Sequence, residues 1–356
     1  MIVMKFGGSS VANADRIKHV ASIIKAYKEK RPAVVLSAMG DTTDHLLEAA
    51  DQAVLGNVDV KGVAKLHEET AAILGVEIET INDLLDELKQ LLTGISMLKE
   101  LSKRTRDYLV SFGERMSVRM MAAYLQSEGI EAKFYDAWDV GFVSDSNYMS
   151  AELLDEVWDN IPKYLTEYKE GRDNAIPIVT GFIAKDKNGI ITTLGRGGSD
   201  LTATMIGAAM KAEEVQTWKD VDGILTTDPR LVKEAKPVPE VTYEEAQELM
   251  QIASAEALNQ GENGMLLVMS VVINRVSSSE YPNTIHEVIH QSHQFYTKGM
   301  KSAEITPEVH MALARLEMGN LYPELVAFER KDNNALDVYY SEAFTHGDHT
   351  FYTCKH

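Results

Sequence analysis

A lysine followed by two glycines, near the start of the chain, is the first segment that could do chemistry. Lys5 lies near the end of an expected strand, residues 2–6, and the sequence KFGGSS occupies positions 5–10. Because Gly7 and Gly8 lack side chains, their backbone amides can approach a polyphosphate, and the lysine ammonium can neutralise its oxygens during transfer. A Gly-Gly pair between a strand and a helix is also common as a simple turn. The Walker sequence G-x-x-x-x-G-K-[ST] is absent, so a nucleotide site here would be of another kind.

An arginine between glycines forms a second candidate segment. Arg196 stands in the sequence GRGGSD, positions 195–200, after an expected strand at 189–194 and before an expected helix. This position is poorly suited to packing and well suited to binding a carboxylate or a phosphate. A structural turn is the alternative interpretation.

Two acidic segments each allow two interpretations. The sequence DVDG begins at Asp220 and is followed by TTDPR, which ends at Arg230; both follow an expected strand at 215–218. They could contact a ligand or form a capped acidic surface turn. Glu114, in the sequence SFGER, lies in a helical stretch, where it could equally face water.

Short apolar runs alternate with longer helical patterns over residues 1–250, and this order predicts an α/β sheet with crossover helices. The expected strands are 2–6, 33–36, 175–180, 189–194 and 215–218, and the first helix is expected at 15–27. Each strand is followed by glycine or small polar residues. In open α/β sheets the ligand lies at the carboxyl ends of the strands, so we expect Lys5 and Arg196 to converge on one pocket.

Composition excludes several classes of partner. The 356 residues include 35 Lys+Arg and 54 Asp+Glu, a formal charge of -19 that would repel nucleic acid and anionic membranes. Cys354 is the single cysteine, so no intrachain disulfide can form. The chain starts with no apolar run of signal-peptide length, and no stretch approaches the ~20 apolar residues of a membrane span. We therefore expect cytoplasmic action without a nucleic-acid or membrane partner.

Residue types change after about position 250. Seven of the ten histidines lie beyond it. Glu256 stands among Ile252, Ala253, Ala255, Ala257 and Leu258. If these surroundings remain apolar in the fold, burial raises the pKa of Glu256 and makes it a plausible general acid; a solvated helix glutamate is the alternative. His286 and His290 are four residues apart but form no H-E-x-x-H motif, so we expect no metal site.

The ordered segments of the first 250 residues resemble the aspartokinases of the amino acid kinase family. The matching segments are KFGGSS at 5–10, VVLSAMG at 34–40, SFGER at 111–115, VTGFIA at 179–184, TTLGRGGSD at 192–200 and DVDGILTTDPR at 220–230. The resemblance implies transfer of the ATP γ-phosphoryl group to the side-chain carboxylate of L-aspartate, with Mg²⁺, in the biosynthesis of lysine, threonine and methionine. It also implies an amino-acid-kinase-like sheet with helices on both faces.

Carried over by position, the resemblance implies three roles. Lys5 would stabilise the transferring phosphoryl group and Asp200 would hold that lysine. The substrate-binding residues would be Arg196 for the α-carboxylate and Glu114 for the ammonium, with Ser37, Thr43 and Ser199 lining the same pocket. The nucleotide contacts would be Gly7, Gly8, Ser9, Asp220 and Arg230.

The sequence departs from that family in two ways. Lys219 and Leu225 replace a common threonine and a common aromatic residue. After VTYEEAQEL the family continues with a motif resembling FGAKVLHP, further core strands and regulatory ACT domains, whereas this chain continues with MQIASAE at 250–256. The resemblance therefore implies a truncated kinase domain, with an incomplete sheet, over 1–250.

Residues 251–356 resemble the SleB-type cell-wall hydrolases, which cut the glycan strand of peptidoglycan. This resemblance implies that Glu256 is the catalytic acid and that Gln294 and His349 line or support its cleft. It also implies a small α+β domain. It does not assign a second catalytic carboxylate beside Glu256. We therefore predict an aspartate kinase, expected to be a homo-oligomer, with two alternatives: peptidoglycan cleavage by the second domain, or an inactive fusion that only binds a partner.

Overall fold

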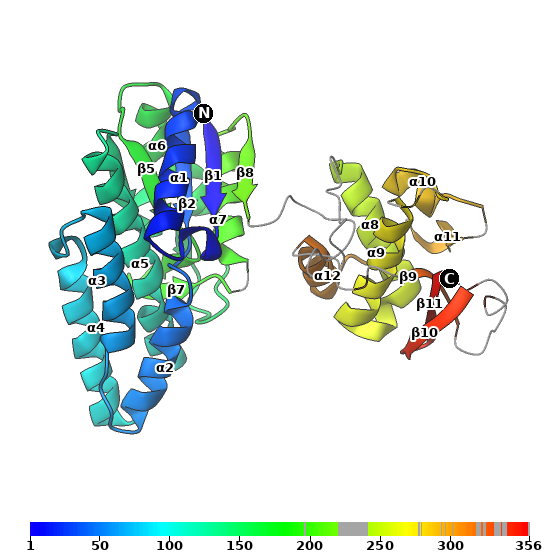
Figure 1. Cartoon of the computed structure of the whole chain (residues 1–356), viewed down its shortest axis with the longest axis horizontal. Helices are drawn as coiled ribbons and strands as arrows, with labels where there is room; N and C mark the ends of the chain where they lie inside the picture. The colour runs from blue at the N-terminus through cyan, green and yellow to red at the C-terminus, as the bar shows by residue number, and fades with distance from the viewer. Residues whose placement is uncertain are drawn as a thin grey trace. The chain divides into compact units, whose positions relative to one another are not determined.

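A five-stranded parallel sheet, in the order β3-β5-β2-β1-β8, organises the first part of the chain (Figure 1). Its strands are β1 Ile2–Phe6, β2 Pro32–Leu36, β3 Ala132–Tyr135, β5 Ile176–Thr180 and β8 Val215–Trp218. Lys5 pairs with Val35 on one side and Thr217 on the other, and Leu36 pairs with Thr180. The carboxyl ends of β1, β2 and β5 therefore lie together at one edge of the sheet.

This computed structural model describes residues 1–195, 197–219, 241–276, 278, 280–292, 294–295, 297–300, 302–317, 322, 325–330, 336 and 340–354. The chain divides into two units, Met1–Asp220 and Val221–His356. The composition change near 250 falls within the second unit. The division into a kinase-like domain at 1–250 and a hydrolase-like domain at 251–356 stays a prediction.

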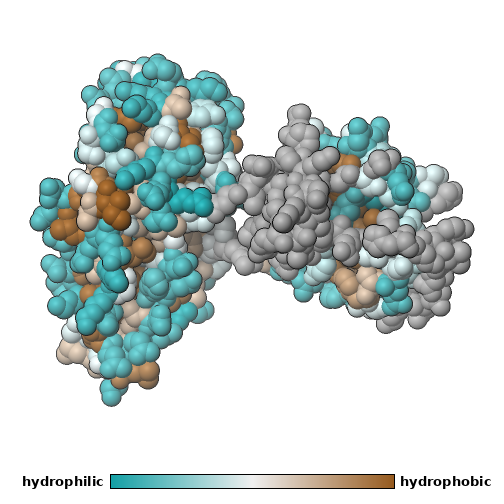
Figure 2. Space-filling view, viewed as in Figure 1, coloured by the Kyte–Doolittle hydropathy of each residue, from teal (hydrophilic) through white to brown (hydrophobic). Residues whose placement is uncertain are grey.

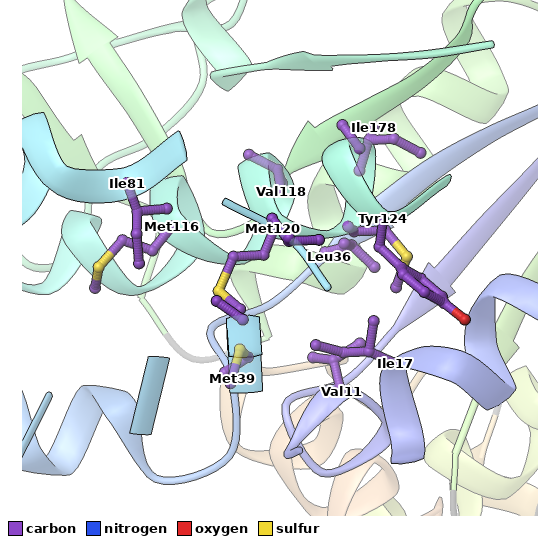
Figure 3. Packing of buried hydrophobic residues seen from close by; sticks show 14 of the residues in the cluster. Val11, Ile17, Leu36, Met39, Ile81, Met116, Val118, Met120, Tyr124 and Ile178 are labelled. Carbon is purple, nitrogen blue, oxygen red and sulfur yellow. The ribbon is translucent and has the colours of Figure 1, made fainter. Parts of the chain in front are cut away.

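Helices cover both faces of the sheet because its central strands are apolar on both sides. On one face, Ile2, Met4 and Phe6 pack with the helices that precede β3. These are α1 Ala14–Ala26, α2 Thr42–Val54, α3 Lys61–Leu74, α4 Glu79–Leu98 and α5 Lys103–Ser127. Figure 3 shows part of this core, including Ile17, Leu36, Met39, Ile81, Met120 and Ile178.

The opposite face packs against two later helices, α6 Glu156–Lys169 and α7 Gly198–Ala209. Val3 of β1 and Val35 of β2 contribute to this second core together with Ile206 of α7. Side chains alternate between the two faces of a strand, so Lys5 lies on the same side as Val3. The alternation thus directs the single charged residue of β1 toward the face that α7 covers.

A smaller sheet, β4-β6-β7, precedes α7. It consists of β4 Val143–Ser144, β6 Ile183–Asp186 and β7 Ile191–Thr193, with β6 and β7 antiparallel. The strand expected at 189–194 is therefore shorter than predicted and belongs to this sheet rather than to the parallel one. Short 3-10 helices complete the unit at Ser9–Val11, Lys28–Lys30 and Ala137–Val140.

The second unit packs helices against a three-stranded antiparallel sheet. Its helices are α8 Tyr243–Ala257, α9 Gly261–Val276, α10 Ile285–Ile289, α11 Thr297–Met300 and α12 Pro307–Glu317, with a 3-10 turn at Leu258–Gln260. The sheet has the order β10-β11-β9, from β9 Leu325–Arg330, β10 Tyr340–His346 and β11 His349–Cys354. This arrangement confirms the expected α+β architecture.

Helix α9 is the centre of the second unit, since its residues from Gly264 to Arg275 are all buried. Met265 and Met269 pack with α8, α10 and α12, whereas Leu267 and Val271 pack against the sheet. A helix that is apolar all round is buried on every side.

Two surface properties follow from the sequence. Among the described helices, none combines the length and hydrophobicity needed to cross a bilayer. On the face shown in Figure 2, hydrophilic residues predominate and hydrophobic ones form small patches.

Candidate active site

Lys5 is a buried cation held by one carboxylate. Its Nζ lies 2.8 Å from Oδ1 of Asp200, and its side chain is 9% exposed, compared with 46% for Asp200. The lysine comes from the carboxyl end of β1 and the aspartate from the first turn of α7. A β-carbon added at Gly7 would lie 3.9 Å from Lys5 Nζ, so the glycine loop after β1 borders the ammonium.

The start of α7 forms another wall of the same site. Gly197 has a φ of 75° and caps the helix, and Gly195 has a φ of 72°. Residues other than glycine rarely adopt this backbone conformation. Helix α7 begins at Gly198. The first backbone N–H groups of a helix have no partner within it and favour a bound anion.

Two serines join β2 to α7 across the pocket. The Oγ of Ser37, just after β2, donates a hydrogen bond to the Oγ of Ser199 at 3.0 Å. A β-carbon added at Gly181 would lie 2.5 Å from Ser199 Oγ. Only glycine at the end of β5 therefore allows the first turn of α7 to approach this closely.

Glu114 is a buried carboxyl group on α5. The backbone N–H of Ala38 donates a hydrogen bond to its Oε1 at 3.2 Å, and its Oε2 has no hydrogen-bond partner among the described residues. Burial raises the pKa of Glu114 to about 8, although the hydrogen bond from Ala38 opposes this. The side chain is thus mainly protonated at neutral pH. The alternative that Glu114 faces water is wrong, because the residue is 4% exposed.

These side chains line one pocket of about 320 Å³. It is lined by Lys5, Ser37, Thr43, Glu114, Phe182, Gly195, Gly197, Gly198, Ser199 and Asp200. Six of the residues that the sequence singled out therefore meet at one place, and Gly7 and Gly8 lie next to it. Three other predicted site residues, Arg196, Asp220 and Arg230, lie outside the described residues, and Ser9 is exposed at the start of the 3-10 helix that follows β1.

Sequence reasoning missed Phe182 and Asp107. Phe182 lines the pocket with a φ of 68°, which is costly for a residue other than glycine and often marks a functional site. Asp107, buried on α5, accepts hydrogen bonds from the N–H of Thr193 at 3.0 Å, from its hydroxyl at 2.9 Å and from the N–H of Met149 at 2.9 Å. Asp107 thereby holds the carboxyl end of β7, the strand that precedes Gly195 and Gly197.

The raised pKa of Glu114 predicts a pH-dependent stability. Below pH 4.5 the carboxyl is protonated in both states, and between 4.5 and about 8 only the unfolded state releases the proton, so stability falls as pH rises. Glu114→Gln removes this dependence. Relative to wild type, we expect the variant to gain ~2–4 kcal/mol in free energy of unfolding between pH 5 and pH 8.

Denaturant unfolding followed by tryptophan fluorescence measures this difference in the first unit alone, because Trp138, Trp158 and Trp218 all lie there. Every other titrating group is common to both proteins and cancels in the comparison. Parallel pH profiles for wild type and Glu114→Gln would contradict the prediction.

The second unit contains a separate pocket of about 700 Å³. It is lined by Ala255, Glu256, Asn259, Gln260, Gln294, Phe295, Phe328, Glu329, Asp348 and His349. Glu256, Gln294 and His349, which the sequence connected, thus lie at one site. Glu256 is half-buried on α8 among polar and aromatic neighbours, and its raised pKa stays a prediction.

Two further acids in this pocket were missed. Glu329 of β9 accepts a hydrogen bond from the hydroxyl of Tyr352 at 2.7 Å, and Asp348 lies in the turn between β10 and β11. His349 begins β11 and is buried; its Nδ1 lies 2.8 Å from Gln260 Nε2, and its ring packs against Phe328. Asp348 directly precedes His349, but the sequence did not indicate that it would line the same pocket as Glu256.

The chain matches two family models, described as Amino acid kinase family over residues 1–282 and Cell Wall Hydrolase over residues 259–352. The chain therefore belongs to the amino acid kinase family. Both resemblances inferred from the sequence are confirmed.

Similar proteins point to one branch of that family. Chloroplastic aspartokinase 1 of Arabidopsis thaliana is 49% identical over 256 residues, which cover 69% of this chain and 45% of that protein. The aspartokinase of Geobacillus stearothermophilus is 34% identical and is covered to 51%. The crystal structure of E. coli aspartokinase III with aspartate and ADP matches at 31% identity and a TM-score of 0.55, covering 70% of this chain and 56% of that one. The chain spans about half the length of the curated relatives it matches.

Proposed function

We propose that this chain is an aspartate kinase that transfers the γ-phosphoryl group of ATP to the side-chain carboxylate of L-aspartate. The observation that carries the proposal is the pocket in which Lys5, Asp200, Ser37, Ser199 and Glu114 meet at the carboxyl ends of parallel strands. The likeness to aspartokinases supports this choice of substrate.

Lys5 is suited to the phosphoryl group because a buried ammonium provides concentrated positive charge where charge shifts during transfer. Its salt bridge with Asp200 fixes the position of the ammonium. The backbone N–H groups at the start of α7 add further positive potential. In the step, an aspartate carboxylate oxygen forms a bond to the γ-phosphorus, and the bond to the β–γ bridging oxygen breaks to release ADP.

Glu114 is suited to the substrate ammonium. A cation bound beside Glu114 favours the ionised carboxylate, so binding of the substrate ammonium releases the proton that Glu114 otherwise retains. The attacking carboxylate needs no general base, since a free aspartate side chain with a pKa of about 3.9 is already ionised at neutral pH. The main requirement for the phosphoryl acceptor is therefore that Glu114, Ser37 and Ser199 position the aspartate.

Asp200 also fits a role beside the metal that nucleotide phosphates carry. Mg²⁺ binds hard oxygen ligands, commonly one or two carboxylates together with phosphates. When bound, it would neutralise charge on the β- and γ-phosphates. Asp200 provides a partly exposed carboxylate next to Lys5.

Homo-oligomerisation and cytoplasmic action stay predictions.

The test is to measure products formed by the full chain with ATP, Mg²⁺ and L-aspartate. We expect ADP release that depends on aspartate, together with an acyl phosphate that hydroxylamine traps as a hydroxamate. Trapping separates transfer to a carboxylate from simple ATP hydrolysis. Release of ADP at the same rate with and without aspartate would contradict the proposal.

A second activity, cleavage of peptidoglycan glycan strands, is supported by the pocket around Glu256. Glycosidic cleavage needs a carboxylic acid beside the scissile oxygen, often with a second carboxylate opposite it. Glu256, Glu329 and Asp348 line one pocket of suitable size. The match to the Cell Wall Hydrolase model, residues 259–352, includes Glu329 and Asp348 and begins just after Glu256.

A further inference from the structure

Three potential metal ligands meet on the surface of the second unit, away from the pocket around Glu256. The ligand atoms of Glu248, His286 and His290 all lie within 4.8 Å of one another. His286 Nδ1 lies 2.8 Å from Glu248 Oε2, and His290 Nε2 lies 3.5 Å from Glu248 Oε1. The two imidazole rings are 4.5 Å apart between centroids.

Local folding fixes the two histidines on one side of α10. The N–H of His290 donates to the carbonyl of His286 at 3.0 Å, a helical hydrogen bond that places their side chains one turn apart. The Oγ1 of Thr284 caps the helix by accepting from the N–H of Glu287 at 3.2 Å. The cluster therefore rests on a defined turn of helix.

Packing against α8 sets the orientation of α10. Ile285, Val288 and Ile289 are buried in the core that also contains Leu249 and Ile252 of α8. The histidines occupy the remaining, exposed face, where Glu248 of α8 meets them. Glu248 is 38 residues from His286 in sequence, so spacing alone could not indicate this third ligand.

The ligand set suits a borderline divalent ion. Two imidazole nitrogens and one carboxylate oxygen are ligands that Zn²⁺ and neighbouring transition metals accept, with further positions open to water. Ligands about 2.0–2.1 Å from one tetrahedral ion lie about 3.3 Å apart. With Glu248 Oε1 as the carboxylate ligand, His286 Nδ1 lies at 3.1 Å and His290 Nε2 at 3.5 Å from it, both close to this value. The His286 side chain is 59% exposed and is therefore free to adjust.

We propose that Glu248, His286 and His290 form a binding site for a divalent transition-metal ion, with Zn²⁺ as its representative, that fastens α10 to α8. This replaces the sequence-based expectation of no metal. Glu248 precedes Glu256 by eight residues, about 12 Å along the helix, so the ion would not reach the reacting bond. It would instead hold together two elements of the neighbouring pocket, because α8 carries Glu256 and the segment after α10 carries Gln294 and Phe295.

The proposal is tested on the full chain after treatment with a chelator. Equilibrium dialysis against Zn²⁺, with elemental analysis, should give one tightly bound ion per chain. Co²⁺ should give visible bands of a four- or five-coordinate ion without the ultraviolet thiolate band that coordination by Cys354 would add. His286→Ala, His290→Ala and Glu248→Gln should each weaken Zn²⁺ binding by about tenfold or more.

Matched controls are Glu244→Gln, on the same helix as Glu248, and His310→Ala, on α12; both positions are exposed. These two variants should bind Zn²⁺ as the wild type does, and Zn²⁺ should raise the Tm of the second unit only in proteins that retain all three ligands. Equal affinity in wild type and the three ligand variants would overturn the proposal. So would a cobalt spectrum that His286→Ala leaves unchanged.

Discussion

Lys5→Ala is expected to lower kcat for aspartate-dependent ADP release by about 10²- to 10³-fold, with a much smaller change in the KM for aspartate. The reason is that the lysine ammonium is buried, points into the pocket from the end of β1 and is held 2.8 Å from Asp200. Its charge would act on the transferring phosphoryl group and not on the ground state of the amino acid. Steady-state assays that couple ADP release to a chromogenic reaction measure both constants.

The matched control is Lys133→Ala. Lys133 also lies on a strand of the parallel sheet, but it is exposed on β3, the edge strand farthest from β1 in the sheet order. Its replacement should leave kcat unchanged. A retained kcat in Lys5→Ala, in a protein whose thermal unfolding matches wild type, would exclude Lys5 as the group that stabilises the phosphoryl group.

The central strands of the main sheet could be predicted from sequence because they are buried on both faces, whereas its edge strand β3, which is partly exposed, was missed. Strands β1, β2 and β5 each appear as a short, almost continuous apolar run that ends at glycine or serine. Their order in the sheet and the separate sheet of β7 could not be predicted, since a pattern of side chains identifies a strand but not its hydrogen-bonding partner.

The pocket was predictable where residue type limits the alternatives. Lys5 is charged within an apolar strand, and the glycines around position 196 separate a strand from a helix. Gly195 and Gly197 line the pocket that Lys5 enters, while the convergence of Arg196 itself stays a prediction. Asp107 was not predictable, because its partner Thr193 is 86 residues away and the contact exists only in the folded chain.

The same limit applies in the second unit. Glu256 was singled out from its apolar neighbours in sequence, but Glu329 and Asp348 come to its pocket from β9 and from the turn after β10. The position of that turn depends on Gly347, which has a φ of 58° and leaves room for Gln260: an added β-carbon would lie 2.7 Å from Gln260 Oε1. Such a contact between distant segments has no local signature.

Glu256→Gln is expected to abolish the loss of turbidity that the full chain causes in purified cell walls, lowering the rate by about 10²-fold or more. Glutamine has nearly the same shape as glutamic acid but cannot give a proton to the leaving glycosidic oxygen. The half-buried position of Glu256 at the end of α8 places its side chain in the pocket, so the substitution changes the chemistry and leaves the packing of α8 intact.

Two further variants separate the mechanisms open to this site. Glu342→Gln, at an exposed position on β10 outside the pocket, should clear walls at the wild-type rate. If Asp348 acts as a second carboxylate that activates water, Asp348→Asn should reduce the rate strongly. If instead a hydroxyl of the cleaved sugar attacks its own anomeric carbon, Asp348→Asn should reduce the rate only slightly. End-group analysis then gives reducing ends in the first case and anhydro ends in the second. Walls that stay turbid with the wild-type chain would remove cleavage of glycan strands from its functions and leave the kinase proposal untouched.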